Sequence, residues 1–339
     1  MREACRMSAE IRDICAGAVA PGVTTGEIDD LVTAYCEKHG VRASFYRFEG
    51  FPGHLCVSIN EEVIHGIPSR SRVIMPGDLV KTDVGIFTHG FHGDTSRTVM
   101  LGVTDPEAVR LVETTKACLK AGIEACGPGV HLGDVGYAIQ KVAEDAGFGV
   151  VRDWIGHGVG RTVHEDPEVP NYGKPGTKLV LKPGMTIAIE PMIALTKRGE
   201  RTEVLDNGWT VVTRDRCLSA HFEHTVAITD DGCEVLTVPA DYPWNLWARR
   251  RLGRMAADCP WWIVRRRGFS MLRAAWIWKV VDPAGLEPTT RRLWVTCSDR
   301  LSYGSVLVMY ILSYSGRWAQ VAREYFWYNT QICRWTRST

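Results

Sequence analysis

The stretch VKTDVGIFTHGFHGDTSRTV, residues 80–99, decides the fold, because it predicts two long β-strands joined by a turn at His89-Gly90. One aspartate stands in each strand, and such a hairpin makes Asp83 and Asp94 near neighbours across the strand pair. Two carboxylates held so close raise the pKa of one of them unless a cation intervenes. The alternative is one aspartate in the turn and one exposed at an edge. The position of both carboxylates inside strand-like runs favours a cation site.

Three further segments each contribute one candidate ligand. His157 lies in IGHGVGRTVHEDP, Glu190 in TIAIEPM and Glu223 in SAHFEHTVAI. The flanking glycines let the backbone approach closely and leave room around the His157 imidazole. Taken singly, a strand glutamate faces solvent and a lone histidine is a core or surface residue. Four carboxylates in comparable settings are expensive to bury unless cations offset them, which predicts a metal site.

The chemistry of these five ligands narrows the choice of metal. Oxygen-rich ligation with one nitrogen suits two divalent ions of Co, Mn, Fe or Zn better than copper or a single catalytic zinc. Bridging carboxylates hold two such ions about 3.5–4 Å apart. The pair deprotonates a bridging water and polarises a carbonyl. The ligand set therefore predicts hydrolysis at neutral pH.

Composition places the chain among globular proteins, with 45% hydrophobic and 23% charged residues in 339. The first residues, MREACRMSAEIRD, have no apolar core of a signal peptide. The longest apolar run near the C-terminus, Val306–Leu312, is far shorter than a membrane span. The eleven cysteines include no CxxC pair, which indicates reduced thiols. We therefore expect a cytoplasmic protein without membrane association.

The net charge of +1 hides two unlike regions. Residues 245–339 hold 15 Arg and one Lys against five acidic residues, whereas residues 1–244 carry an excess of ten negative charges. Ten of the twelve tryptophans also lie after residue 243. We expect residues 241–339 to be a poorly structured extension or a segment that is not a native domain, such as read-through. An Arg/Trp arm for nucleic acid is the alternative.

An internal repeat divides the first 240 residues. PGVTTGEIDDLVTAYCEKHG at 21–40 matches PGVHLGDVGYAIQKVAEDAG at 128–147. Both segments have apolar residues at helical spacing and end in a glycine that suits a helix C-cap. Each follows another helical stretch, at 4–20 and 106–125. The repeat predicts two similar halves, about 1–125 and 126–240.

Short β-branched segments predict the strands. They are HLCVSIN, RVIM, DLVKTDVGIFT, GFHGDTSRTVML, MTIAIE, TVVTR and HTVAIT. Two helices and then strands in each half predict an α+β fold, with a largely antiparallel central sheet and helices on its outer face. A site at the seam between the halves is a common arrangement.

The chain resembles type I methionine aminopeptidases, which have the "pita-bread" fold. The runs that carry the resemblance are VIHGIP, KTDVGIFTHGFHGDTSRT, GHGVGRTVHEDPEVPNYG, GMTIAIEPM and DNGWTVVTRDRCLSAHFEHTVAIT, and it covers about residues 1–240. Type II enzymes carry a long helical insertion between the last two glutamate ligands. Glu190 and Glu223 are only 33 residues apart, which leaves no room for such an insertion. The resemblance implies removal of the initiator methionine from nascent chains when the next residue is small.

The resemblance also implies roles for the ligands. Asp83 chelates one ion, His157 binds the other, and Asp94 and Glu223 bridge both. Glu190 completes the His157 ion and handles the proton of the bridging water. Two further histidines, His65 and His164, contact the substrate and stabilise the tetrahedral intermediate.

The methionine side chain is expected in an apolar pocket. The resemblance places Phe48, Phe51, Cys56 and Trp209 there. Phe48 stands where a tyrosine is usual and Glu49 where a histidine is frequent. These departures concern fine specificity rather than the reaction.

Two other functions fit parts of the sequence. A proline-directed aminopeptidase shares the fold but has a large N-terminal domain. A non-catalytic scaffold that binds ribosome or RNA is supported only by the Arg-rich region, since none of the five ligands is lost. We therefore expect a monomer that meets nascent polypeptide N-termini near the ribosome and binds no nucleic acid.

Overall fold

The computed structural model describes residues 1–238, and the expectations for residues 241–339 lie outside this range. Four α-helices and two 3-10 turns occur within the described residues. They are α1 (Arg2–Gly17), α2 (Thr25–His39), α3 (Pro106–Ala125), α4 (Leu132–Asp145), η1 (Phe48–Gly50) and η2 (Lys197–Glu200). Within residues 1–238 none of the helices combines the length and apolar character needed to cross a bilayer.

Local capping explains where these helices begin and end. Thr24 and Glu27 form a capping box at the start of α2, and Gly40 ends the helix in the left-handed conformation. Asp105 caps α3, with a proline at its first position. The apolar stripe predicted for α2 is buried at Ile28 and Val32. The helix predictions from the sequence are thus confirmed at these positions.

The strands pair antiparallel throughout the described residues and form four small sheets. Their bounds are β1 (Arg42–Ala43), β2 (Cys56–Ile59), β3 (Glu62–Ile64), β4 (Leu79–Thr88), β5 (Phe91–Met100), β6 (Gly149–Val150), β7 (Gly156–Gly158), β8 (Glu165–Val169), β9 (Thr186–Ile189), β10 (Met192–Ala194), β11 (Thr202–Val204), β12 (Val211–Thr213), β13 (Ser219–His221), β14 (His224–Thr229) and β15 (Gly232–Val235). The sheets contain β1, β4, β2 and β5; β13, β10 and β6; β11, β12 and β3; and β15, β14, β9, β7 and β8.

Strands β4 and β5 form the predicted hairpin. Their register pairs Asp83 with Ser96 and Gly85 with Asp94. The two aspartates are therefore diagonal neighbours on one face of the strand pair, two register positions apart. The turn falls at His89-Gly90, as expected, because both residues have positive φ angles.

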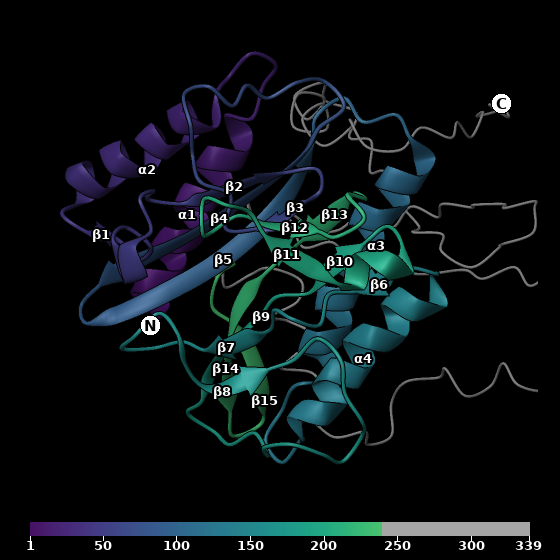
Figure 1. Ribbon diagram of the computed structural model, residues 1–339. Coiled ribbons are helices and arrows are strands. Elements are labelled where there is room, and N and C mark those ends of the chain that lie inside the picture. The colour runs from purple at the N-terminus through teal and green to yellow at the C-terminus, as the bar shows by residue number, and fades with distance from the viewer. Residues whose placement is uncertain (239–339) are drawn as a thin grey trace, which may run out of the picture. The chain divides into compact units, whose positions relative to one another are not determined.

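Each helix pair packs on a different group of strands (Figure 1). Helix α1 contacts β4 and β5, and α2 packs beside α1, whereas α3 contacts β9, β10 and β13, and α4 contacts α3 and β6. Two large apolar clusters follow the same division, one around Ile28 and Val84 and one around Leu119 and Ile187. The α+β expectation is confirmed.

Two details differ from the sequence predictions. Residues 72–75, RVIM, form no strand and contribute a single bridge between Thr24 and Val73. The expected central sheet is also divided, since Glu190-Pro191 separates β9 from β10 and Phe222-Glu223 separates β13 from β14. Proline has no N–H for a sheet ladder, which explains the first break. Both glutamates therefore lie between strands rather than inside them.

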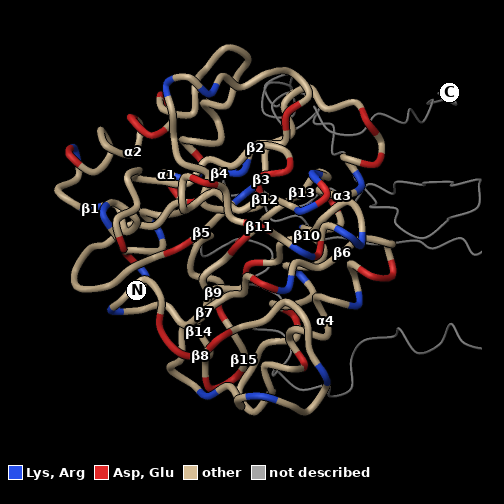
Figure 2. Tube along the Cα trace, in the orientation of Figure 1, with Lys and Arg blue, Asp and Glu red and all other residues tan. Residues whose placement is uncertain are grey.

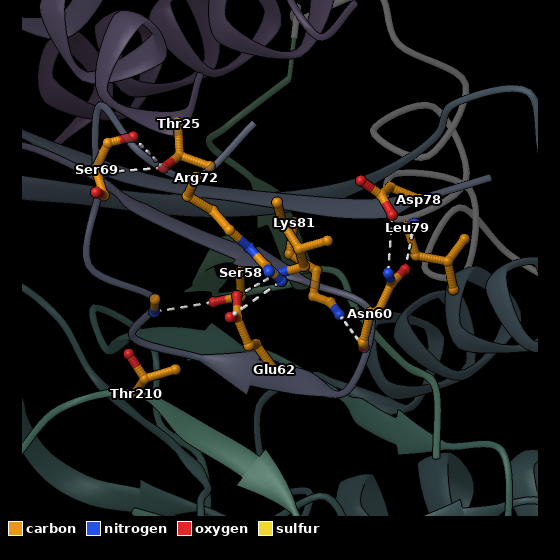
Figure 3. Close-up of polar contacts among 12 residues, drawn as sticks. Thr25, Ser58, Asn60, Glu62, Ser69, Arg72, Asp78, Leu79, Lys81 and Thr210 are labelled. Carbon is orange, nitrogen blue, oxygen red and sulfur yellow. Dashed lines mark hydrogen bonds and ion pairs between the residues drawn. The ribbon is translucent and has the colours of Figure 1, made fainter. Parts of the chain in front are cut away.

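A buried cation joins the two groups of strands. Lys81 is among the largest fully buried side chains of the described residues, and its Nζ donates to Asn60 O at 2.6 Å (Figure 3). Its Nζ also donates to Ser219 Oγ at 3.2 Å. Glu62 lies in the same network, 3.4 Å from Arg72. Burial lowers the pKa of Lys81 to about 7, which the charge of Glu62 partly offsets. The network therefore ties β4 to β13.

Candidate metal centre

One cavity of about 880 Å³ is lined by all eleven residues that the sequence nominated. They are the five candidate ligands Asp83, Asp94, His157, Glu190 and Glu223, the two histidines His65 and His164, and the pocket residues Phe48, Phe51, Cys56 and Trp209. They come from segments up to 175 residues apart, between Phe48 and Glu223. The fold thus assembles distant parts of the chain into one site.

Hydroxyl groups hold Asp94 and Glu223 next to each other. Thr225 Oγ1 accepts from the Asp94 backbone N at 3.2 Å and donates to its carbonyl at 2.8 Å. Thr95 Oγ1 donates to the Glu223 carbonyl at 2.9 Å, and the Glu223 N donates to Ser96 O at 3.0 Å. These hydrogen bonds join β5 to the segment before β14 at the backbones of the two residues that carry the carboxylates.

His157 faces these carboxylates from β7. Its Nδ1 lies 2.9 Å from Gly158 O, and a carbonyl only accepts, so Nδ1 carries the proton and Nε2 presents a lone pair. Nε2 lies 3.4 Å from Glu190 Oε1 and 4.0 Å from Asp94 Oδ2. Donor atoms of Asp94, His157 and Glu223 all lie within 4.8 Å of one another. Asp83 and Glu190 line the same cavity beside this group.

The electrostatics of the site are those of a cation-binding centre. Burial raises the pKa of Asp94 to about 7 and raises those of Asp83, Glu190 and Glu223 well above their usual range, with mutual repulsion adding to the last three. Burial lowers the pKa of His157 to about 3, so its imidazole is neutral and able to ligate. Bound cations would restore the charge of the carboxylates.

The orphaned oxygens give a direct test of whether metal ions fit. Among the described residues, Asp83 Oδ1, Asp94 Oδ1 and Glu223 Oε1 are buried without any hydrogen-bond partner. A buried carboxylate oxygen without a donor is costly. These atoms belong to three of the five candidate ligands, and together with a histidine nitrogen they form a donor set suited to divalent ions. The residues present therefore fit the metal that the sequence predicts.

An apolar compartment adjoins the carboxylates. Phe45, Phe51, Cys56 and Val163 form a buried cluster, with Trp209 packed against it. The rings of Phe51 and Trp209 pack edge to face with their centroids 5.1 Å apart, and those of Phe48 and His164 do so at 5.3 Å. Aromatic and thiol groups suit a polarisable thioether ligand.

The remaining histidines line the cavity between the two compartments. The imidazole of His164 packs edge to face against that of His157, with the ring centroids 4.2 Å apart. His65 adopts a positive φ of 56°, an uncommon conformation for a residue with a side chain. The next residue must be glycine, because a Cβ on Gly66 would lie 2.2 Å from Val57 O. Burial lowers the pKa of His65 to about 4 and also lowers that of His164.

Sequence reasoning missed several residues of the cavity. Trp154 lines it and meets His65 edge to face at 5.3 Å. Only Trp154 and Trp209 precede residue 244, so their rarity in this region was a usable signal. No Lys or Arg is among the described residues that line the cavity. Five acidic residues besides the candidate ligands do line it, and three of them lie in β8 (Figure 2). These five are Glu49, Asp153, Glu165, Asp166 and Glu168.

An α+β fold with a carboxylate-rich metal centre and an apolar pocket defines a class of metal-dependent hydrolases. The sequence profile of metallopeptidase family M24 matches residues 1–230. The chain belongs to metallopeptidase family M24, whose members use divalent metal, and the candidate metal-binding cluster is present.

Relatives within this family include bacterial methionine aminopeptidases. The chain is 46% identical over 238 residues to methionine aminopeptidase A of Synechocystis, covering 70% of this chain and 93% of the relative. It is 44% identical over 243 residues to the methionine aminopeptidase of Escherichia coli K12, covering 71% and 91%. The resemblance stated from the sequence is confirmed.

Solved structures agree with these relationships. The methionine aminopeptidase of Thermotoga maritima aligns with a TM-score of 0.68 and 43% identity, covering 70% of this chain and 94% of that one. A prolidase from Pyrococcus furiosus aligns with a TM-score of 0.55 at 24% identity, which shows a shared fold. The fold class predicted from the sequence is confirmed.

Proposed function

We propose that this chain is a methionine aminopeptidase that removes an N-terminal methionine when the next residue is small. The observation that carries the proposal is the junction of a buried carboxylate–histidine centre with an apolar aromatic compartment in one cavity. The acidic lining favours a substrate with a free α-ammonium group, because no Lys or Arg is among the described lining residues. The similarity to methionine aminopeptidases supports the same activity.

We assign the metal-binding roles as follows. Asp94 and Glu223 would be shared by two divalent ions of Co, Mn, Fe or Zn, Asp83 would hold one of these ions, and His157 and Glu190 would hold the other. The 3.4 Å contact between His157 and Glu190 supports their pairing. When bound, the ions supply polarisation of the scissile carbonyl and a nucleophilic water that loses its proton near neutral pH.

The chain's own groups perform the proton transfer and orient the substrate. Glu190 accepts the proton of the nucleophilic water and returns it to the leaving amine. The imidazoles of His65 and His164 hydrogen-bond the substrate and stabilise the developing oxyanion. Phe48, Phe51, Cys56 and Trp209 receive the methionine side chain.

The setting of the enzyme is part of the proposal. Its substrates are nascent polypeptide N-termini near the ribosome, and it acts as a monomer in the cytoplasm. All eight described cysteines are free thiols, seven of them buried, which fits a reducing compartment. Residues 1–240 form the catalytic unit from two related halves, and the family match over residues 1–230 supports this boundary.

Release of methionine from two tripeptides tests the function. Chelator-treated full-length protein is incubated with Met-Ala-Ser or Met-Leu-Ser, with and without Mn²⁺ or Co²⁺. We expect metal-dependent release from Met-Ala-Ser and at least about 100-fold slower release from Met-Leu-Ser. The His157→Ala variant is the inactive control. Absence of metal-dependent release from Met-Ala-Ser would overturn the proposal.

A further inference from the structure

His221 is a buried histidine beside the centre that the roles above do not use. It ends β13, and its side chain is only 1% exposed. Its backbone is held on both sides by one hydroxyl, since His221 N donates to Thr98 Oγ1 at 3.0 Å and Thr98 Oγ1 donates to His221 O at 2.7 Å. The ring is therefore carried by a fixed piece of backbone.

The two ring nitrogens of His221 face different groups. Nδ1 lies 3.0 Å from Ser96 Oγ. Nε2 lies 3.6 Å from Glu190 Oε2 and, among the described residues, is buried without a hydrogen-bond partner. The other carboxylate oxygen, Glu190 Oε1, lies 3.4 Å from His157 Nε2. The Glu190 carboxylate thus sits between two imidazoles, of which only His157 has a ligand role.

We propose that His221 is a positioning residue that donates its Nε2–H to Glu190 Oε2 and so orients Glu190 for metal binding and proton transfer. This inference rests on the proposed function of the centre. In the tautomer that this requires, Nδ1 accepts from the Ser96 hydroxyl and the ring proton lies on Nε2. A shift of about 0.4 Å brings Nε2 and Oε2 within hydrogen-bond distance. The contact strengthens when Glu190 is ionised, because a charged acceptor makes shorter bonds.

A hydrogen bond to a ligating carboxylate has a measurable effect. Partners of this kind orient a ligand and typically change metal affinity or activity about 10- to 100-fold when removed. Glu190 Oε1 faces His157, and Glu190 Oε2 faces His221. Among the contacts described above, His221 is the one donor that can orient Oε2.

Two variants of His221 separate the hydrogen bond from the shape of the ring. His221→Leu keeps an apolar volume and removes the donor, whereas His221→Gln keeps an N–H donor at a similar reach. Mn²⁺ is titrated calorimetrically into chelator-treated full-length protein, and kcat and KM are measured with Met-Ala-Ser. We expect His221→Leu to weaken Mn²⁺ binding and to lower kcat by about 10- to 100-fold, with little change in KM. His221→Gln should restore most of both.

Two further variants complete the test. Ser96→Ala leaves the imidazole in place but removes the anchor of its tautomer, so we expect an intermediate loss of Mn²⁺ affinity. His224→Gln is the matched control, because this buried imidazole lies in the same segment and its Nδ1 contacts Thr237 Oγ1 at 2.8 Å. We expect its Mn²⁺ affinity to stay within about threefold of the wild type.

The possible results distinguish this inference from the function on which it rests. Wild-type Mn²⁺ affinity in His221→Leu would overturn the inference, as would an equal loss in His221→Gln and His221→Leu. If His221→Leu fails to fold, Ser96→Ala decides, and an unchanged affinity there overturns the inference. Wild-type protein that neither binds Mn²⁺ nor releases methionine would overturn the proposed function itself.

Discussion

Asp94 and Glu223 illustrate how a fold can hold carboxylates where they are unfavourable. Their side chains are each 2% exposed, and each has an oxygen without a partner among the described residues. The hydroxyls of Thr95 and Thr225 bind their backbones rather than their carboxylates. The geometry is therefore maintained independently of the charge, and the oxygens stay available to a cation.

The pH dependence of the metal-free protein tests this at Asp94. Burial raises its pKa from 3.8 to about 7, so the folded state binds more protons than the unfolded state between these values. The contribution of Asp94 to the free energy of unfolding is therefore fully present below pH 3.8, and it is lost as the pH rises through about 7. In urea unfolding with chelator, Asp94→Asn should gain more than about 1 kcal/mol over the wild type between pH 5 and pH 8. Parallel pH profiles would contradict the burial of an uncompensated carboxylate.

Phe51 tests the apolar compartment. Its ring is 3% exposed and packs edge to face against Trp209. Phe51→Ala enlarges the pocket, so we expect kcat/KM for Met-Ala-Ser to fall about 10- to 200-fold. Mn²⁺ affinity, measured by calorimetry, should not change, because Phe51 touches none of the candidate ligands in the contacts given above. Unchanged kcat/KM would place the methionine side chain elsewhere.

At the scale of elements, β7 positions His157 through two close backbone approaches. A Cβ on Gly158 would lie 2.2 Å from Asp166 O, and one on Gly156 would lie 2.3 Å from Ala188 O. Neighbouring strands therefore approach β7 more closely than any side chain allows. The glycines around His157 serve the packing of the strand that carries it.

Gly158→Ala should move His157 without changing its chemistry. The new methyl group forces β7 away from β8, and we expect a loss of Mn²⁺ affinity of at least about 10-fold in calorimetric titration. Gly17→Ala is the control, because a Cβ there meets no heavy atom within 4 Å. Equal affinities in the two variants would show that the close approach does not position the ligand.

Local patterns made some of these elements predictable. The β4–β5 hairpin followed from alternation and a His-Gly turn, both properties of neighbouring residues. The strand break at Glu190 has a local signal in Pro191, whereas the break at Glu223 has none, because Glu223 stands in a run that alternates like a strand. The prediction of a strand at RVIM, residues 72–75, was wrong, because β-branched composition alone does not provide a partner strand. The contact of His221 with Glu190 depends on the tertiary fold and has no sequence signal.

At the scale of the whole molecule, the site joins segments that lie far apart in the chain. Asp94 comes from β5 and Glu223 from the segment before β14, and the Thr225 hydroxyl joins the two segments. The repeat in the sequence predicts a site at the seam of two halves, and that division stays a prediction, whereas the ligand geometry has no signal in the repeat. The roles of the individual ligands remain proposals.

Shortening the chain tests the boundary of the catalytic unit. A chain that ends at Ala240 should release methionine from Met-Ala-Ser within about threefold of the full-length rate, because residues 1–238 contain the whole cavity lining described above. Rates are compared at equal Mn²⁺ and protein concentration. A truncated chain that is insoluble or inactive would show that later residues belong to the catalytic unit.

The central claim is that five residues of distant segments hold two metal ions in one centre. Anomalous diffraction from crystals of the protein grown with Mn²⁺ tests it most directly. We predict two anomalous peaks about 3.5–4 Å apart, both within bonding distance of Asp94 and Glu223, with Asp83 at one peak and His157 and Glu190 at the other. A single peak, or peaks that leave Asp94 and Glu223 without a metal ion, would contradict the account.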